Sequence, residues 1–129
     1  ISRPSSATSN TRVSWEIIEF IGLPGTDNEM IVRGVGEVSL VSTEFTDSGA
    51  VITDVSDDSD VVVFITGQQN QDQGTTNYND GLFTAQWDDV ASQPTFERGD
   101  ADSSADLGYA VVEFTGRNWH TQRIEHTYT

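Results

Sequence analysis

Short apolar segments alternate regularly with clusters of turn-forming residues along this chain. Stretches rich in Val, Ile, Phe, Thr and Trp are separated by groups of Gly, Asp, Asn and Ser, a pattern typical of many short β-strands. No window of eleven or more residues has the i, i+3, i+4, i+7 apolar spacing of a helix, so the helical crossovers of a parallel sheet are missing. The sequence therefore predicts an all-β fold of antiparallel strands.

We expect about eight strands, arranged as a two-sheet sandwich or jelly roll, with a closed β-barrel as the alternative. The continuous apolar run 61–65 suits a central strand covered on both faces, whereas the weaker alternation in 50–55 suits an edge or half-buried strand. The segment 30–41 contains Gly34 and Gly36, where we expect a bend or a split. The expected strands are 13–21, 30–41, 50–55, 61–66, 82–87, 95–98, 107–115 and 119–128.

The chain has 129 residues, which is enough for one hydrophobic core and too short for two comfortable ones. Residues 1–12 are rich in Ser, Thr and Asn without periodicity, and we expect an extended N-terminal arm there. Residues 13–129 are then a single β-sandwich domain. The first residue is Ile1, so we expect the numbering to begin after a processing site or at the first ordered residue.

The charge balance is strongly acidic: 21 Asp and Glu face six basic residues, all Arg, and the net charge is −15. Such a surface repels itself at ordinary ionic strength, and molar salt removes most of that repulsion. We therefore expect a halophilic protein, with an ordinary acidic secreted protein as the alternative. Without a basic patch, nucleic acid and anionic membranes are disfavoured as partners. The chain has no Cys and no apolar run approaching the ~20 residues of a membrane span, so we expect no membrane insertion.

Two distant segments are similar to each other. Residues 13–22, VSWEIIEFIG, align without a gap onto residues 107–116, LGYAVVEFTG. One interpretation is that two strands in like environments converged on one pattern; the other is that the chain holds slightly more than one period of a repeat. Under the second interpretation, the end of one chain could occupy in a neighbour the position of that neighbour's own start.

Several of these segments resemble a known class of proteins. The stretches WEIIEFIG, VVEFTG and NWHTQRIEHTY, within 13–41 and 107–129, resemble a repeat of secreted and virion-surface β proteins from salt-loving archaea, their viruses and marine bacteria. The central VVVFITGQQN and LFTAQWDD also resemble the H-type lectin and phage tail-fibre sandwiches, although the Cys of the animal lectins are absent. These resemblances imply assembly, decoration or glycan attachment, and they carry no catalytic residue onto this chain.

Two acidic clusters could hold a cation. The second begins like a calcium loop, but Ala105 replaces the required Gly and the closing Glu is missing, which excludes an EF-hand. Each cluster is either a Ca²⁺ or Na⁺ site or a solvated loop of a salt-adapted surface, and no other cofactor is indicated. The candidate ligands are Asp54, Asp57, Asp58 and Asp60 in the first cluster, and Asp100, Asp102 and Asp106 in the second.

The polar segment 67–81 is a candidate binding loop. Long loops on a β scaffold are often functional, and amide, carboxylate and aromatic groups suit sugar recognition, although an uncommitted surface loop has the same composition. The candidate residues are Gln69, Asn70, Asp72, Asn77, Tyr78, Asn79 and Asp80.

The C-terminal segment and the arm carry candidate interface residues. His120 and His126 have even spacing and share one strand face, which favours a surface or interface role over a zinc site because no third ligand is in register. The matched Glu19 and Glu113 lie between apolar residues, and we expect structural pairing with Arg33 and Arg123 rather than catalysis. The interface candidates are Arg12, Trp119, His120, Arg123, His126 and Tyr128.

The chain has no Cys and no Gly-x-Ser-x-Gly elbow, so nothing indicates nucleophilic catalysis and we expect no enzyme. The leading hypothesis is an oligomeric structural protein on a cell or virion surface or otherwise extracellular, such as a capsid-decorating, turret, fibre or filament subunit. The alternative is a lectin-like attachment module that uses the 67–81 loop.

Overall fold

The computed structural model describes residues 23–70 and 78–122. In chain order these form six strands and two short 3₁₀ helices. The strands are β1 (Ile31–Leu40), β2 (Thr46–Ser48), β3 (Val61–Asn70), β4 (Phe83–Asp88), β5 (Gln93–Arg98) and β6 (Ala105–Glu113), and the 3₁₀ helices are η1 (Asp58–Asp60) and η2 (Tyr78–Gly81). Within the same ranges, no helix has the length and apolar character needed to cross a bilayer.

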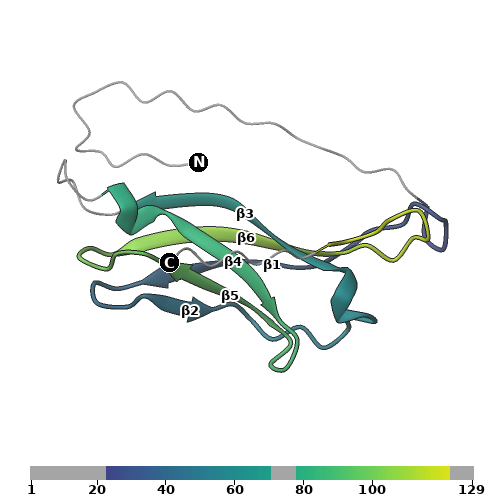
Figure 1. The fold of residues 1–129 in the computed structure, drawn as a ribbon, viewed down its shortest axis with the longest axis horizontal. Coiled ribbons are helices and arrows are strands. Elements are labelled where there is room, and N and C mark those ends of the chain that lie inside the picture. The colour runs from purple at the N-terminus through teal and green to yellow at the C-terminus, as the bar shows by residue number, and fades with distance from the viewer. Residues whose placement is uncertain (1–22, 71–77, 123–129) are drawn as a thin grey trace, which may run out of the picture.

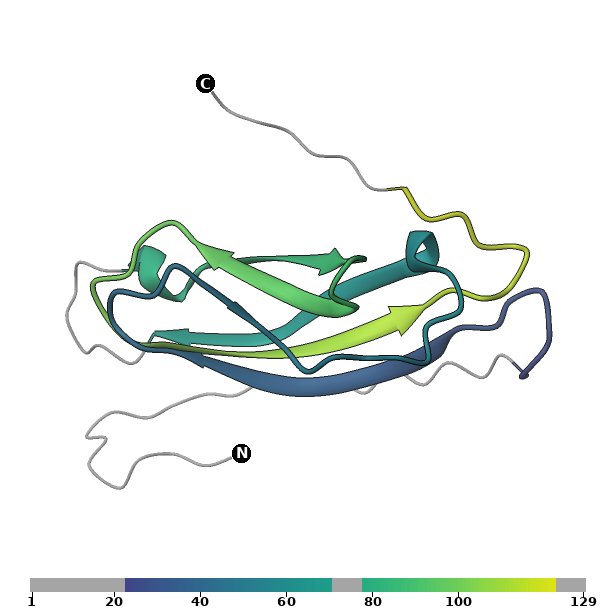
Figure 2. The same cartoon turned by 90° about the horizontal axis from the view of Figure 1, so that it is seen from below.

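The strands form two antiparallel sheets that lie one over the other (Figures 1 and 2). One sheet has the order β1-β6-β3 and the other β2-β5-β4. The sheets do not close into a barrel, so the predicted all-β antiparallel sandwich is confirmed and its barrel alternative is wrong.

The core lies between the sheets and follows the period-two alternation of the strands. Leu107, Tyr109 and Val111 point inward from β6, and Phe96 and Trp87 meet them from the other sheet. The rings of Tyr109 and Phe96 lie 5.1 Å apart. Gly36 of β1 must lack a side chain because a Cβ there would lie 2.6 Å from the Tyr109 hydroxyl.

The strand β1 runs without a break through both glycines. Its register with β6 shifts once, between Val32 and Gly34, and the extra residue is Arg33. Such a bulge re-aims a side chain, and here the Arg33 guanidinium reaches the buried carboxylate of Glu113. The predicted split at the glycines is therefore replaced by a local shift in register.

The predicted strand 50–55 is wrong, and the predicted strand 119–128 is not formed in the part of it that the structure describes. Residues 50–55 form no strand, because their amides find single partners rather than a ladder: Ala50 donates to the Tyr109 hydroxyl at 3.0 Å and Ile52 to the Ser92 carbonyl at 2.8 Å. The short strand β2 precedes them instead. Residues 119–122 are also irregular. The arm 1–12, the predicted strand 13–21 and residues 123–128 lie outside the described residues.

The strand order differs from the prediction that residues 61–65 form a central strand. The apolar run Val61, Val62, Val63, Phe64 and Ile65 belongs to β3, which lies at an edge of its sheet, while β6 is central. The side chain of Phe64 is 46% exposed. Within the described residues, β3 therefore has the composition of a central strand and the position of an outer one.

Candidate functional site

The outer face of the β1-β6-β3 sheet carries an apolar surface that points away from the core. The strand registers place Val112 between Val32 and Val62, and Ala110 between Val35 and Phe64. Val35 is 73% and Val32 is 60% exposed. We call the set of six the outer apolar face: Val32, Val35, Val62, Phe64, Ala110 and Val112.

The outer apolar face covers only half of the sheet. Farther along the strands the same face turns polar, with Glu37 beside Gly108 and with Asp106 between Ser39 and Gln69. Monomeric proteins tend to scatter their exposed apolar residues singly, and contiguous rows mark contact surfaces. The apolar half is therefore a surface of this acidic protein that is suited to meet another apolar surface.

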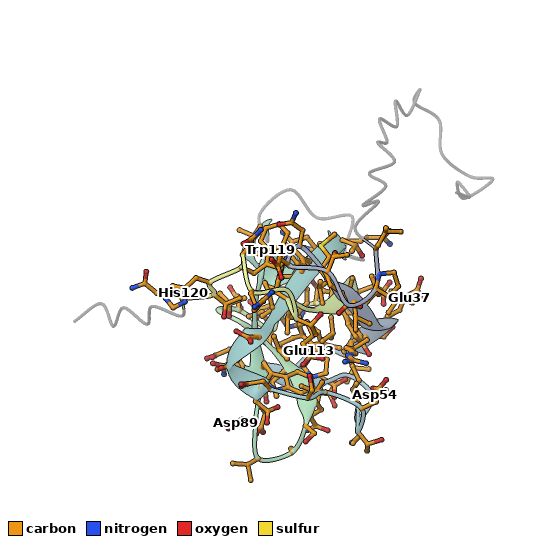
Figure 3. All side chains as sticks on the ribbon, turned by 90° about the vertical axis from the view of Figure 1, so that its right-hand side faces the viewer. Glu37, Asp54, Asp89, Glu113, Trp119 and His120 are labelled. Atoms are coloured by element: carbon orange, nitrogen blue, oxygen red, sulfur yellow. The ribbon has the colours of Figure 1, made fainter. Side chains whose placement is uncertain are left out.

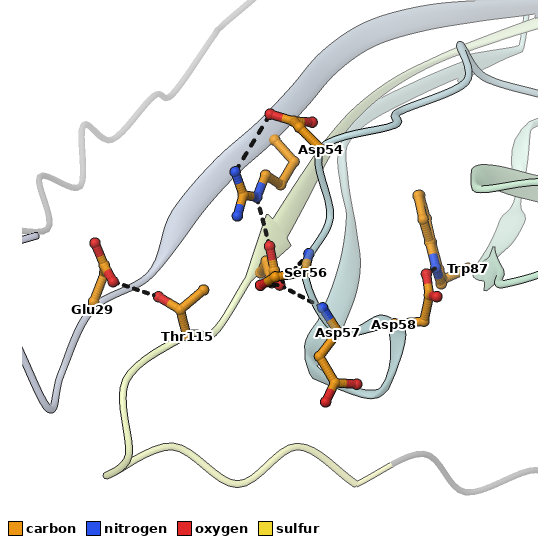
Figure 4. A network of polar contacts seen from close by, with 9 residues as sticks. Glu29, Asp54, Ser56, Asp57, Asp58, Trp87 and Thr115 are labelled. Atoms are coloured by element: carbon orange, nitrogen blue, oxygen red, sulfur yellow. Dashed lines mark hydrogen bonds and ion pairs between the residues drawn. The ribbon is translucent and has the colours of Figure 1, made fainter. Parts of the chain in front are cut away.

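A buried carboxylate fixes one end of this sheet. Glu113, 1% exposed, accepts hydrogen bonds from Arg33 Nε at 2.6 Å and from the Ser56 and Asp57 amides at 2.9 Å (Figure 4). The Ser56 hydroxyl donates to the same carboxylate oxygen as the two amides. Burial raises the pKa of Glu113, but the bonds from Ser56, Asp57 and Arg33 outweigh it and hold the pKa below its ordinary value. The predicted structural pairing of Glu113 with Arg33 is confirmed, whereas Glu19 and Arg123 lie outside the described residues.

The carboxylates of the first acidic cluster each have a separate structural partner. Asp54 contacts Arg33 at 3.4 Å, and Asp58 accepts from the Trp87 indole at 2.7 Å (Figure 4). Asp57 caps η1 through the Ser59 hydroxyl and amide, and these bonds lower the pKa of Asp57. Asp60 accepts from the Thr121 hydroxyl at 3.3 Å. In residues 23–70 and 78–122, no three carboxylates or imidazoles come together as metal ligands would.

The described ends of the candidate binding loop, Asn70 and Asp80, meet Ser103 of the second acidic segment at the opposite end of the sandwich. Asp80 of η2 is fully buried, and the Ser103 hydroxyl contacts both Asp80 Oδ2 and Asn70 Oδ1, the latter at 2.8 Å. Asp80 Oδ1 has no hydrogen-bond partner in the described ranges. Because Asp80 is fully buried, its carboxylate faces the interior of the sandwich and not the solvent from which a sugar would bind.

A second buried charged residue at this end is Arg98, which is only 2% exposed. Its guanidinium donates exclusively to backbone carbonyls in the bonds that the structure shows: Glu44 at 2.8 Å, Val41 at 2.8 Å, Ser103 at 2.7 Å and Asp80 at 3.1 Å. One side chain thus ties the loop after β1, the helix η2 and the loop before β6 together.

The remaining candidate residues are spread over the molecule. The Asp100 carboxylate accepts from the Ala101 amide at 2.8 Å, Asp102 is exposed, and Asp106 lies in β6 on the polar half of the outer face. Gln69 ends β3 together with Asn70, and Tyr78 and Asn79 belong to the backbone of η2. Asp72 and Asn77 lie outside the described residues.

Of the interface candidates, Trp119 and His120 are described. The Trp119 and Phe114 rings pack edge to face, with their centroids 5.2 Å apart. His120 is exposed and lies at the periphery of the molecule in Figure 3, whereas Glu113 lies near its middle. Arg12, Arg123, His126 and Tyr128 lie outside the described residues.

Sequence reasoning missed the outer apolar face. Its members come from three strands that are far apart in the chain, so only the strand order and register bring them together. The available signal was that β1 and β3 carry valines and a phenylalanine on the same face as their polar residues, which breaks the usual alternation.

The fold and this surface define an antiparallel two-sheet β-sandwich with an exposed apolar sheet face. Comparison of the chain with protein-family models, with curated proteins and with solved structures finds no match.

Proposed function

We propose that the chain is a non-enzymatic structural subunit of an extracellular or virion-surface assembly adapted to high salt, and that copies meet through the outer apolar face. The single observation that carries this proposal is the exposure of Val32, Val35 and Phe64 in adjoining rows of one sheet. Burying a Val or Phe side chain contributes roughly 1.5–3 kcal/mol. Three such side chains on each copy are of the same order as the roughly 4–15 kcal/mol that association costs.

The net charge determines when such contacts form. Each copy carries −15, and copies repel one another strongly in dilute buffer. In molar salt the Debye length falls to about 3 Å, so the apolar attraction outweighs the screened repulsion. Assembly should therefore be stronger at high ionic strength.

The substitution Val35→Asp tests the proposal. It places a carboxylate in the middle of the contact while leaving the core unchanged, and we expect it to weaken association at least about tenfold, since 1.4 kcal/mol is tenfold. Multi-angle light scattering in 2 M NaCl, over a range of protein concentrations, measures the mass of the particles. Wild-type protein that stays monomeric throughout would refute the proposal.

The matched control is Val90→Asp. Val90 is 92% exposed and lies in the turn between β4 and β5, away from the β1-β6-β3 sheet. The substitution Val90→Asp replaces an exposed valine by a carboxylate, as Val35→Asp does, and we expect it to leave the particle mass unchanged. If both variants dissociate the assembly equally, added charge and not the outer apolar face is responsible.

A glycan-binding module is the second candidate function. A polar hollow on the outer face of the β2-β5-β4 sheet is lined by Thr46, Thr84, Gln86, Thr95 and Glu97 among others, and hydroxyl, amide and carboxylate groups suit sugar hydroxyls. The aromatic side chains at its floor, Trp87 and Phe96, are buried, so it offers no exposed ring for stacking. A glycan array probed with the wild-type protein and with Gln86→Ala would test this candidate.

A further inference from the structure

The polar hollow on the β2-β5-β4 sheet has a row of oxygen-bearing side chains at its centre. The strand registers place Glu97 of β5 between Thr46 of β2 and Thr84 of β4, and all three residues are exposed. The chain neighbours of Glu97, Phe96 and Arg98, are buried on the opposite side of the strand. Two hydroxyls and one carboxylate therefore stand side by side on the open face of the sheet.

A second row of hydrogen-bonding groups lies beside the first. Thr95 lies between Ser48 and Gln86, two residues along each strand, which corresponds to about 6.6 Å at 3.3 Å per residue. The hollow that the two rows line has a volume of about 770 Å³, within the range of roughly 300–1,000 Å³ that small-molecule sites occupy. Hydroxyl and amide groups both donate and accept hydrogen bonds, so the second row suits a ligand with several hydroxyls.

The polar hollow is negatively charged. Among the described residues that line it, four are acidic and none is Arg or His. The three described arginines are engaged elsewhere, Arg33 and Arg117 in ion pairs and Arg98 in contacts with backbone carbonyls. An anionic ligand would meet like charge in this hollow, whereas a cationic ligand would be attracted. The charge of the hollow therefore favours a cationic ligand.

Of these carboxylates, Glu97 is the one at the centre of the first row. The Asp88 carboxylate already accepts from two amides of the β4–β5 turn at 3.0 Å, and the Asp47 carboxylate accepts from the Ser48 amide at 2.7 Å. The ion pairs of the described residues do not include Glu97. Its carboxylate therefore faces the hollow without a cation from the described part of the chain.

The first row matches the donors of a primary ammonium group. An ammonium group has three N–H donors and no acceptor, and the row supplies one carboxylate and two hydroxyl oxygens. The Thr84 hydroxyl donates its proton to the Glu97 backbone carbonyl at 3.3 Å, so the lone pairs of its oxygen remain to accept a bond. Three acceptors thus converge where an ammonium group would lie.

We propose that the polar hollow binds an amine-bearing saccharide, with its ammonium group on the first row and its hydroxyls on the second. This inference rests on the glycan-binding candidate function and names the class of glycan. A neighbouring hollow shares Asp89 and is also lined by Asp58, Ser59 and Thr121. The polar surface therefore continues beyond one sugar unit and suits a short chain of them.

A saccharide fits the hollow better than a basic peptide does. The side chains of a peptide would bring apolar groups as well as cations, and the large apolar residues at the floor, Trp87 and Phe96, are buried. The second row consists of hydroxyl and amide groups, which match ligand hydroxyls that both donate and accept. The composition of the lining thus favours a ligand that is polar around the whole of its ring.

Three tetrasaccharides with one common skeleton test the proposal. At one carbon of each sugar, the glucosamine tetramer carries an ammonium group, its N-acetylated form an amide, and cellotetraose a hydroxyl. At about pH 5.5 and 0.5 M NaCl, we expect the glucosamine tetramer to bind at least about fivefold more tightly than the other two, as an exposed ion pair allows. Titrations followed by amide NMR measure the affinities and should shift resonances of β4 and β5.

The outcomes separate the amine from glycan binding in general. Equal affinities for all three tetramers would leave glycan binding in place and overturn the amine. Failure of all three to bind would overturn both. A linear triamine without hydroxyls that binds as tightly as the glucosamine tetramer would overturn the saccharide, because the ammonium groups alone would then explain recognition.

The variants Glu97→Gln and Glu37→Gln form a matched pair. Each removes one exposed carboxylate, the first in the hollow and the second on the outer face of the other sheet. We expect Glu97→Gln to weaken binding of the glucosamine tetramer about fivefold and Glu37→Gln to change it less than about twofold, with thermal melts showing that both fold. Equal losses would show that net charge alone attracts the ligand and would overturn the site.

The variant Val35→Asp separates this site from the proposed assembly. Val35 lies on the β1-β6-β3 sheet, so we expect Val35→Asp to bind the glucosamine tetramer as the wild-type protein does, whether or not the wild-type protein assembles. A loss of binding in this variant would show that the hollow of one copy is not sufficient and would overturn the proposal.

Discussion

At the scale of single residues, two of the described arginines, Arg33 and Arg98, are placed where each satisfies several acceptors. Arg33 holds Glu113 at one end of the sandwich, and Arg98 binds carbonyls at the other. A planar guanidinium with five donors suits both sites, and an ammonium group would not. The absence of Lys is therefore consistent with structural demand as well as with a salty exterior.

The carboxylate of Glu113 should make stability depend on pH. Its folded pKa lies below the ordinary value of 4.5, so its contribution is present above 4.5 and is lost as the pH falls through the folded pKa. We expect Glu113→Gln to lower the free energy of unfolding at pH 7 by roughly 1.5–3 kcal/mol and to lessen its decline in acid. Urea denaturation at pH 7 and pH 3.5 in molar salt measures both effects.

The control for this substitution is Glu97→Gln, which alters an exposed carboxylate on β5. We expect it to change the free energy of unfolding by no more than about 0.5 kcal/mol and to keep the wild-type acid response. A Glu113→Gln protein that retains the full acid response would show that other carboxylates determine it.

At the scale of elements, the sequence predicts most strands and misses what depends on their neighbours. The strands β1, β3, β4, β5 and β6 fall on predicted segments because β-branched residues and turn clusters mark them locally. Residues 50–55 have a similar composition but form no strand, because the amides of Ala50 and Ile52 donate to the Tyr109 hydroxyl and the Ser92 carbonyl. These partners lie more than thirty residues away in the chain. The outer apolar face depends on strand order, which local patterns do not encode, whereas the Glu113 and Arg33 pair was predictable because each stands among apolar residues.

The loops at the far end of the sandwich should depend on Arg98. Replacing it by Lys keeps the charge but leaves at least one buried carbonyl without a donor, so we expect Arg98→Lys to lower the free energy of unfolding by about 3 kcal/mol. Arg117→Lys is the matched control, because the Arg117 side chain is 85% exposed and pairs with Asp27 at the surface, and such pairs contribute roughly 0–1 kcal/mol. Chemical denaturation of both variants measures the difference, and equal losses would contradict the role given to Arg98.

At the scale of the whole molecule, the balance of charge and apolar area determines both folding and association. A net charge of −15 on a chain of 129 residues opposes the folded state at low ionic strength. We expect the melting temperature to rise steadily between 0.1 and 2 M NaCl, measured at a protein concentration low enough to prevent association. KCl should act as NaCl does, since screening depends on ionic strength, and a melting temperature that falls with added salt would contradict the prediction.

The strand β3 carries no charged side chain, whereas each of the other five strands that the structure describes carries Asp, Glu or Arg. Charge repulsion between copies therefore comes from residues outside β3, and β3 itself contains no charged residue that would oppose contact with another chain. If copies meet through the outer apolar face as proposed, dilution of the surrounding electrolyte should separate them and concentration should bring them together, reversibly and without any covalent modification. Dialysis from dilute buffer into brine would then be sufficient to start association, and dialysis back would reverse it.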